Sequence, residues 1–335
     1  MKAALSAITI ATLHLVGHAQ TCQWASSLGS TNSTTRIEQV RSYPGAHALV
    51  CGTFAATSMV LGDQTLTNNG QDDSFIALAD ANGDYQWATR IGGANNDIAT
   101  DVAAHTSGEF VAVGNFRSVF LTVGDTTLSN TGESDAFLAK FNADRSLAWV
   151  KQIGGTEIDE ATCVRMDVSG NIHVSGQVIN KFTQQTIHLF IRKYAPNGNL
   201  LWERTGISES GAAYSSALAL DDEQNVYLSG WMYGTVTFDN TTLIGDQGFA
   251  AYVVKHDQNG TLLTTTMSYD HGDFTALEAH ENSLYACARD VNYGIGWGWP
   301  LGDSKVYTLK LDQELNTIWS RDFGGETPKI GRAHV

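Results

Sequence analysis

The chain has 335 residues, a formal net charge of -15 and a pI near 4.9. This acidity excludes a nucleic-acid-binding protein, because phosphate backbones require clustered lysine and arginine side chains. Only four prolines stand against 33 glycines, and about 10% of the residues are aromatic, a composition typical of many short strands joined by tight turns.

The first 19 residues are typical of a secretory signal peptide. Met1 and Lys2 give a positive start, residues 3–16 are apolar, and Gly17-His18-Ala19 offers a small-residue cleavage site. The apolar run is shorter than the roughly 20 residues that a membrane-spanning helix needs. We therefore expect residues 1–19 to be removed and the mature protein to be secreted, extracellular or displayed at the cell surface, without a membrane span.

The rest of the chain is an internal repeat. An aromatic residue stands twelve positions before an anchor position, which is tryptophan in all copies but one. A glycine then follows at nearly constant spacing and ends an alternating run of apolar residues, as a strand requires. The aromatic and anchor pairs are Phe75 and Trp87, Phe137 and Trp149, Phe190 and Trp202, Tyr252 and Thr264, and Tyr307 and Trp319; the glycines are Gly52, Gly114, Gly176 and Gly230.

Each copy is predicted to form four strands, the pattern of a propeller blade. In the second copy these strands are expected at 99–104, 110–116, 136–141 and 147–153. Five complete blades are expected at about 34–92, 97–153, 159–206, 213–267 and 273–323, and residues 22–28 form a lone copy of the fourth strand. The sequence therefore predicts an all-β protein, a β-propeller of four-stranded blades over residues 20–328.

Two kinds of loop follow from the repeat. Asn-Gly pairs, as in residues 80–84, 196–199 and 257–260, predict tight hairpins between the third and fourth strands. Between the second and third strands the length varies, and units one, two and four carry a small hairpin at 61–66, 123–128 and 238–243. A scaffold that varies in one class of loop often presents its function there.

The lone strand at 22–28 predicts how the ring closes. A strand from the other terminus can complete the last blade and so remove an unpaired edge, which leaves three strands to be supplied downstream. Residues 329–335 have no place in the repeat, and their back-translation resembles a sequencing adapter, so we interpret them as an assembly artefact. We expect an intact protein of six or seven blades, of which this chain is a C-terminally truncated fragment.

The four cysteines Cys22, Cys51, Cys163 and Cys287 form no CxxC motif and predict no metal cluster. Cys22 and Cys51 are able to pair if their strands lie together, since an oxidising compartment permits disulfides. Buried free thiols that act as small apolar side chains are the simpler interpretation.

The motif W-x(4)-GG-x(3)-D, followed by a V-x-G strand and DAF-x-AK, resembles the secreted bacterial beta-propeller repeat family, abbreviated SBBP. Residues 87–97 and 149–159 match best, and the resemblance covers about residues 22–325. It implies a propeller of about seven blades in an exported protein, commonly with a C-terminal sorting or adhesion module such as a type IX secretion signal. No catalytic residues come with this resemblance. Gly206-Ile207-Ser208 and Thr264 depart from the pattern, which puts the packing of units four and five in question.

A second resemblance concerns Asp80, Gly83 and Trp87, whose spacing is similar to the tryptophan-docking repeat of quinoprotein dehydrogenases. That repeat is structural in those enzymes as well. A quinoprotein would also need an adjacent disulfide ring and an acidic metal site, and the sequence predicts neither.

Three aspartates, Asp97, Asp159 and Asp273, recur where the inner strands begin. The simpler interpretation is that each carboxylate accepts hydrogen bonds from the backbone N–H groups of its loop. The alternative is a partial acidic ring at one end of the central channel, which would hold calcium through oxygen ligands. No other cofactor is predicted.

The loop at 293–300 contains three aromatic residues between glycines, Tyr293, Trp297 and Trp299. They are interpreted either as a packing substitute for the missing tryptophan at position 264 or as an aromatic platform for a sugar or a partner chain.

The sequence contains no HExxH, no G-x-S-x-G elbow and no phosphate-binding loop, and no catalytic residue is predicted. The favoured function is a secreted or cell-surface, non-catalytic scaffold that binds a protein or a glycan. Fold alone leaves two alternatives open: a secreted hydrolase or lyase with its site at the end of the channel, and a structural spacer in a larger adhesin.

Overall fold

A computed structural model describes residues 34–183, 185–268, 272–289 and 306–323. Within these ranges all regular elements are β-strands, and the strands pair antiparallel. None of the described residues belongs to a helix long and apolar enough to cross a membrane. The expected signal peptide, the lone strand at 22–28 and the C-terminal residues 329–335 lie outside the described residues.

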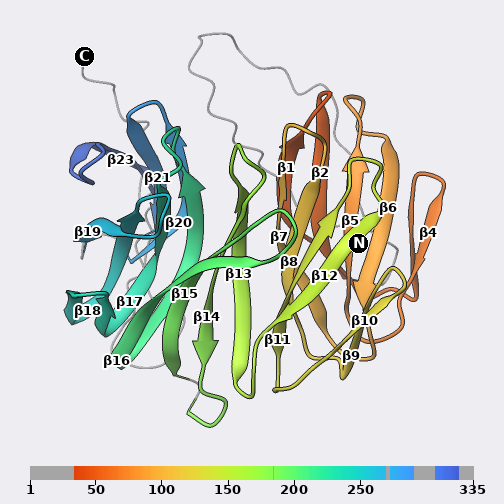
Figure 1. The fold of residues 1–335 in the computed structure, drawn as a ribbon, viewed down its shortest axis with the longest axis horizontal. Coiled ribbons are helices and arrows are strands. Elements are labelled where there is room, and N and C mark those ends of the chain that lie inside the picture. The colour runs from red at the N-terminus through yellow and green to blue at the C-terminus, as the bar shows by residue number, and fades with distance from the viewer. Residues whose placement is uncertain (1–33, 184, 269–271, 290–305, 324–335) are drawn as a thin grey trace, which may run out of the picture.

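Five four-stranded units, here called blades 1 to 5, follow one another across the molecule (Figure 1). Blade 1 contains β1 (Thr35–Tyr43), β2 (His47–Phe54), β5 (Asp73–Ala79) and β6 (Tyr85–Gly92), and blade 2 contains β7 (Asp97–Ala104), β8 (Phe110–Phe116), β11 (Asp135–Phe141) and β12 (Leu147–Ile153). Blade 3 contains β13 (Ile158–Met166), β14 (Ile172–Ile179), β15 (Thr186–Tyr194) and the first part of β16 (Leu200–Leu220). Blade 4 contains the rest of β16, β17 (Val226–Phe238), β18 (Thr241–His256) and β19 (Leu262–Ser268), and blade 5 contains β20 (Asp273–His280), β21 (Ser283–Arg289), β22 (Val306–Leu311) and β23 (Thr317–Phe323). The prediction of an all-β propeller of four-stranded blades is confirmed.

The variable loops form the small hairpins that the sequence predicts. Blade 1 carries β3 (Ser58–Leu61) with β4 (Gln64–Thr67), and blade 2 carries β9 (Phe120–Val123) with β10 (Thr126–Ser129). In blade 4 the long strands β17 and β18 form the hairpin themselves, with Phe238 opposite Thr241. The hairpin of blade 2 also joins two blades, because Val123 of β9 pairs with Ile91 of β6.

The recurrent position requires glycine because an aromatic ring and the backbone of a bulged strand pack against it and leave no space for a Cβ atom. Gly114 in β8 lies directly opposite Phe137 in β11, and a Cβ atom at Gly114 would stand 2.6 Å from the Phe137 ring and clash with the Ile98 carbonyl oxygen. The inner strand β7 is irregular just after this point, between Ala99 and Asp101. The same arrangement recurs at Gly52 with Phe75, Gly176 with Phe190 and Gly230 with Tyr252.

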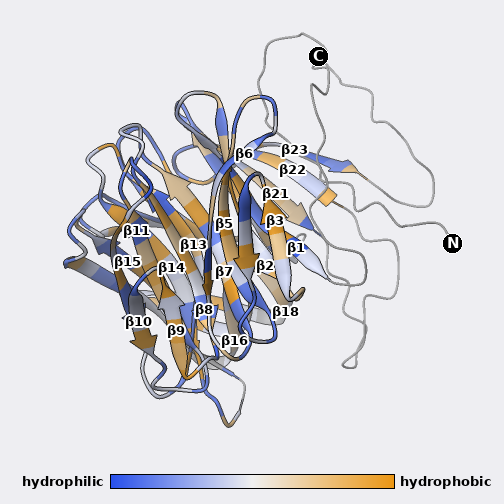
Figure 2. Cartoon of the chain, turned by 90° about the vertical axis from the view of Figure 1, so that its right-hand side faces the viewer, coloured by the Kyte–Doolittle hydropathy of each residue, from blue (hydrophilic) through white to orange (hydrophobic). Residues whose placement is uncertain are grey.

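Among the described residues, four hydrophobic clusters lie between neighbouring blades and a fifth lies within blade 1. One cluster joins Leu49 and Ile76 of blade 1 to Phe110 and Phe137 of blade 2, and similar clusters join blades 2 and 3, 3 and 4, and 4 and 5. Figure 2 shows the hydrophobic colour gathered along the strands and the hydrophilic colour gathered in the loops. Each blade is therefore stabilised mainly by the blade beside it.

Between blades 3 and 4 the chain passes without a break. At the two preceding junctions a double glycine opens a loop, but here Gly206, Ile207 and Ser208 stay inside β16 and pair with β17. The departure of this segment from the repeat therefore lengthens one strand so that it serves two blades.

Candidate functional site

Asp97 and Asp159 cap the loops between blades. Asp97 is fully buried and accepts hydrogen bonds from the Gly93 N–H (2.7 Å) and from the hydroxyl and N–H of Ser118 (2.7 and 3.2 Å). Asp159 accepts one from the Gly155 N–H at 2.9 Å. Burial raises the pKa of both carboxyl groups, and these N–H donors oppose that rise. Both aspartates thus have the structural role that the simpler interpretation assigns.

Asp273 has different partners. Its carboxylate accepts hydrogen bonds from the Ser216 hydroxyl at 2.8 Å and from the Arg289 guanidinium at 3.2 Å. Nowhere in the described ranges do three or more acidic, histidine or cysteine side chains gather in a way that would hold a metal ion, so Asp97, Asp159 and Asp273 are not brought into one cluster. The calcium hypothesis stays a prediction, and a melting temperature that does not change during calcium titration would contradict it.

Tyr293, Trp297 and Trp299, the other predicted site residues, lie outside the described residues. Cys22 does so as well. Cys51, Cys163 and Cys287 are free thiols, and whereas Cys51 and Cys163 are buried as expected, Cys287 is exposed. The exposure of Cys287 is informative because its position is buried in every other blade.

A lysine and a tryptophan of one blade bind the hairpin turn of the next. In blade 3 the Lys193 ammonium and the Trp202 indole N–H both donate to the Gln258 carbonyl oxygen in the turn of blade 4, at 3.3 and 3.1 Å. Lys140 and Trp149 of blade 2 donate in the same way to Pro196 of blade 3, at 3.2 and 3.1 Å. The polar contact between neighbouring blades is therefore a repeated device.

The lysines of this device are buried and neutralised within their own blades. Lys193 forms an ion pair with Asp167 at 3.1 Å, and Lys140 forms one with Glu109 at 2.9 Å. Lys193 and its counterpart Lys255 are 7% and 5% exposed. Sequence reasoning assigned no role to these lysines, although each stands three residues after the recurrent aromatic residue. That spacing is the signal that would have found them.

The outward side of blade 5 carries the same residue types, and none of the described residues forms a further blade over it. We define the open face of blade 5 by the side chains of Tyr285, Cys287, Lys310, Trp319 and Arg321. Tyr285 pairs with Lys310 across β21 and β22, and Lys310 with Trp319 across β22 and β23, the register of the other blades. The positions that correspond to Cys287 are fully buried, namely Cys51, Val113, Ser175 and Ser229.

The geometry of the open face is already that of a blade interface. The Lys310 ammonium lies 5.4 Å from the centre of the Tyr285 ring, as Lys255 lies 5.1 Å from Tyr227 in the covered face of blade 4. Every residue of β23 is exposed, which is true of no outer strand in blades 1 to 4. The face is thus formed in advance of any contact.

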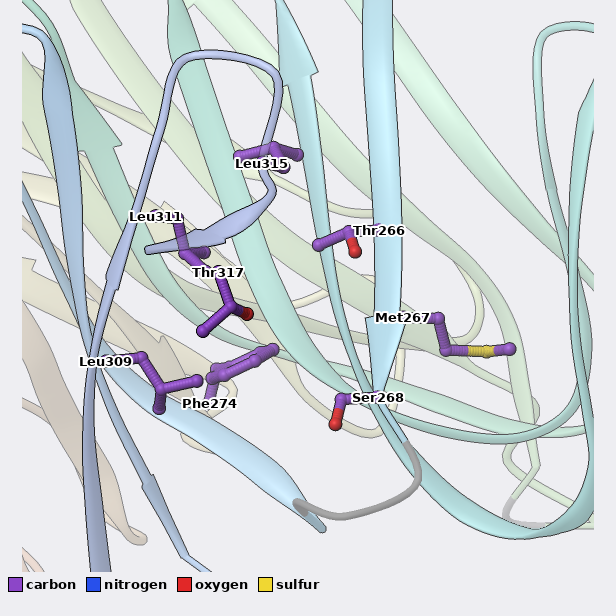
Figure 3. A pocket seen from close by; sticks show the side chains of 8 residues that line it. All are labelled: Thr266, Met267, Ser268, Phe274, Leu309, Leu311, Leu315 and Thr317. Carbon is purple, nitrogen blue, oxygen red and sulfur yellow. The ribbon is translucent and has the colours of Figure 1, made fainter. Parts of the chain in front are cut away.

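A cavity of about 120 Å³ lies between blades 4 and 5. Figure 3 shows Thr266 and Ser268 of β19 on one side and the apolar side chains of blade 5 on the other, while the side chain of Met267 points away. The lining from blade 5 consists of Phe274, Leu309, Leu311, Leu315 and Thr317.

A charged triplet links the inner strands of blades 1, 2 and 3. The Asp101 side chain is 1% exposed and forms ion pairs with Arg41 at 3.1 Å and Arg165 at 2.7 Å. It also accepts a hydrogen bond from the Val164 N–H at 3.0 Å. Because one carboxylate satisfies groups of three blades, its role is to hold their inner strands together.

The chain is distantly similar to a curated protein and to a solved structure. No protein-family model matches the chain. A curated relative, "Uncharacterized WD repeat-containing protein L264" of Acanthamoeba polyphaga mimivirus, is 23% identical over an alignment that covers 76% of this chain. The chain spans about a quarter (24%) of that relative's length. Among solved structures, the Pan2 WD40 domain of Neurospora crassa aligns with a TM-score of 0.39 and 8% identity, covering 81% of this chain and 75% of the domain.

The expected membership of the SBBP repeat family is wrong. No family model matches, and the curated relative that aligns is described by a different propeller repeat, the WD repeat. The motif that carried the resemblance is nevertheless real, and its residues have the packing roles described above.

Proposed function

We propose that the chain is a non-catalytic propeller scaffold that binds a protein, and that the open face of blade 5 is its docking surface. The supporting observations are that Cys287 is exposed on this face, although its counterparts in the other blades are fully buried, and that every residue of β23 is exposed. The relative with WD repeats is consistent with this proposal. The buried carboxylates Asp97, Asp101 and Asp159 have structural partners, which favours a scaffold over an enzyme.

The occupant that fits this face is a β-sheet of a partner protein with a hairpin turn at its edge. In the covered interfaces the acceptor is the backbone carbonyl of such a turn, reached by a lysine and a tryptophan. Lys310 and Trp319 are the matching donors on the open face. A partner sheet would also cover Tyr285 and Cys287, so that apolar burial and charge-assisted hydrogen bonds would both contribute.

The test places a photocrosslinking amino acid at position 321, beside Trp319, in the full chain. The captured protein is identified, purified and titrated against wild type, Lys310→Glu, Trp319→Ala and the control Phe182→Ala, whose side chain is also exposed. We expect the two face variants to bind at least tenfold more weakly and the control to bind as wild type does. Capture of only this protein itself, either a second copy or the further blade that the repeat predicts downstream, would overturn the proposal, as would equal binding by all four proteins.

Export belongs to the proposal as well. The support is the signal-peptide pattern of residues 1–19, and the expected result is a mature chain that begins near Gln20 in the extracellular fraction. Recovery of the uncleaved chain from inside the cell would contradict it.

A further inference from the structure

We propose that one face of the long sheet in blade 4 binds a neutral, unbranched chain of hexopyranose sugars. This surface, here called the aromatic face of blade 4, is defined by the side chains of Tyr214, Trp231, Tyr233 and Phe249. They belong to β16, β17 and β18, and none of them is part of the open face of blade 5. The sugar site therefore does not depend on the protein-docking function proposed above.

Blade 4 carries this face because its strands extend further than those of the preceding blades. In blade 2, β8 ends at Phe116, two residues after the recurrent Gly114. In blade 4, β17 continues to Phe238, eight residues after Gly230. Strands β16 and β18 pair with β17 along this extension, so it is a three-stranded sheet.

The described strands of blade 5 do not follow this extension. The pair Asp273 and Arg289 in blade 5 stands where Tyr214 and Trp231 pair in blade 4, and β21 ends at Arg289. Because β17 continues beyond that level, the described part of blade 5 covers only the lower part of the sheet of blade 4.

The two sides of the extension differ in burial. Met232, Val236 and Phe238 are buried in the core between blades 3 and 4. The alternate residues of β17 point to the opposite side, where Trp231 is half-buried and Tyr233 is 49% exposed. The same side carries Ile207 and Ile244, which pair with Thr237 and Thr235 and are 52% and 51% exposed.

Trp231 stands where other blades use an amide side chain for packing. Asn115, its counterpart in blade 2, accepts a hydrogen bond from the Ala161 N–H of blade 3 at 2.8 Å. Gln177, its counterpart in blade 3, accepts one from the Ser215 N–H of blade 4 at 3.0 Å. An indole ring has no acceptor and cannot replace this contact. The tryptophan therefore adds aromatic surface at the expense of a blade-to-blade hydrogen bond.

The four rings form a continuous row. The Tyr214 and Trp231 rings are stacked with their centres 4.5 Å apart, and the Phe249 ring meets Trp231 edge-on at 5.3 Å. The Tyr233 ring follows at 5.7 Å from Phe249. A row of neighbouring rings offers successive contacts to a ligand that is itself a chain of rings.

The chemistry of the face suits a neutral sugar chain. The C–H side of a pyranose ring is apolar and packs against an aromatic ring, whereas its hydroxyl groups need polar partners at the margin. The Tyr233 phenol and the exposed hydroxyls of Thr237 and Thr242 are such partners. The described side chains of this face carry no charge, in a chain whose net charge is -15, so a neutral ligand is favoured over an ionic one.

A protein partner fits the aromatic face less well. A stable protein interface takes about 20 to 30 residues on each side, and the described side chains of this face are far fewer. A row of four rings is enough to contact several linked sugars. The occupant that fits is therefore a polysaccharide in an extended conformation.

The test is calorimetric titration of the full chain with cellohexaose, a neutral hexasaccharide of β-1,4-linked glucose, and with the disaccharide cellobiose. We expect saturable binding of cellohexaose and at least about fivefold weaker binding of cellobiose, which contacts fewer rings. Added salt should leave the affinity for cellohexaose unchanged, since no charged contact is involved. Absence of saturable cellohexaose binding, or an affinity that falls steeply with salt, would overturn the proposal.

Variants at Tyr233 connect the binding to this face. Tyr233→Ala removes an exposed ring and should bind cellohexaose about fivefold or more weakly, whereas Tyr233→Phe keeps the ring and should bind more tightly than Tyr233→Ala. The control Phe182→Ala removes an exposed ring elsewhere and should bind as wild type does. Thermal melting verifies that each variant is folded. Equal affinity of all four proteins would overturn the proposal. So would a Tyr233→Ala protein that keeps its affinity for cellohexaose and loses affinity for the partner captured at position 321, because the face would then be a protein interface.

Discussion

Replacing His256 with leucine should stabilise the protein and reduce its sensitivity to acid. His256 is 1% exposed in the core between blades 3 and 4, and its Nδ1 atom has no hydrogen-bond partner. The pKa of this imidazole is lowered from 6.5 to about 4, mainly because the ring is buried. The corresponding positions in the other blades carry aliphatic or aromatic side chains, namely Ala79, Phe141, Tyr194 and Leu311.

The sign and size of the effect follow from this pKa. Because the folded value lies below the unfolded value, the unfolded chain binds more protons between pH 6.5 and 4, and the free energy of unfolding falls as the pH drops through that window. A difference of about 2.5 pKa units corresponds to about 3 kcal/mol, which is reached only near pH 4. At pH 5 the expected loss is about 2 kcal/mol. A leucine at this position cannot titrate and removes the term.

The assay is urea unfolding of wild type, His256→Leu and the control His280→Leu at pH 7 and pH 5. His280 is exposed on blade 5, so its replacement is the matched histidine-to-leucine change outside the core. The difference in unfolding free energy between His256→Leu and wild type should grow by about 2 kcal/mol on acidification. An equal difference at both pH values would refute the reasoning, since His173 and all carboxyl groups are common to the compared proteins.

Three further predictions concern the contacts between strands and blades, each measured as a change in unfolding free energy. Gly114→Ala should lower the unfolding free energy by about 3 kcal/mol because the added Cβ atom meets the Phe137 ring and a backbone carbonyl. The control Gly155→Ala has open space around it and should change the unfolding free energy by no more than about 0.5 kcal/mol. Equal effects of the two substitutions would contradict the glycine–aromatic explanation. Asp101→Asn should lower the unfolding free energy by about 3 to 5 kcal/mol because it leaves two guanidinium groups without their counter-charge. If the exposed control Asp144→Asn lowers the unfolding free energy as much, Asp101 does not link the blades. Thr264→Trp should be destabilising alone and should recover at least about 1 kcal/mol when combined with Leu315→Gly, because Leu315 stands at the turn position where Gly198 and Gly260 lie against the tryptophan of the preceding blade. Additive effects would contradict that exchange.

The strand pattern was predictable because each repeat position has one physical cause. The pairing of Gly52 with Phe75, and of Gly114 with Phe137, is a local contact between neighbouring strands, and its signature is a fixed spacing in the sequence. The turn residues Asn82 and Gly83 also form their hydrogen bonds with a residue only two or three positions away, Asp80. Local causes of this kind can be recognised from one sequence.

The candidate sites were harder to predict because their causes lie in different blades. Lys193 meets its acceptor Gln258 across 65 residues, so the fixed spacing that marks the lysine does not identify its partner. The cavity between blades 4 and 5 is lined by Thr266 of one blade and Leu315 of the other, and a threonine in a strand is unremarkable alone. The open face of blade 5 is defined by exposure, which the sequence does not contain, since Trp319 is the same residue type as the covered Trp149.

The packing also explains why a family resemblance gave the right fold and the wrong family. In the motif W-x(4)-GG-x(3)-D, Trp149 is required by the turn of the next blade, and Gly154 by the Asp135 carboxylate, which leaves no room for a Cβ atom. Gly155 presents the N–H that Asp159 accepts. The letters of the motif are thus specified by contacts within a blade, as for Gly154, and by contacts with the next blade, as for Trp149. Such contacts depend on how four-stranded blades pack, so the motif is evidence for the stacking and says little about descent or task.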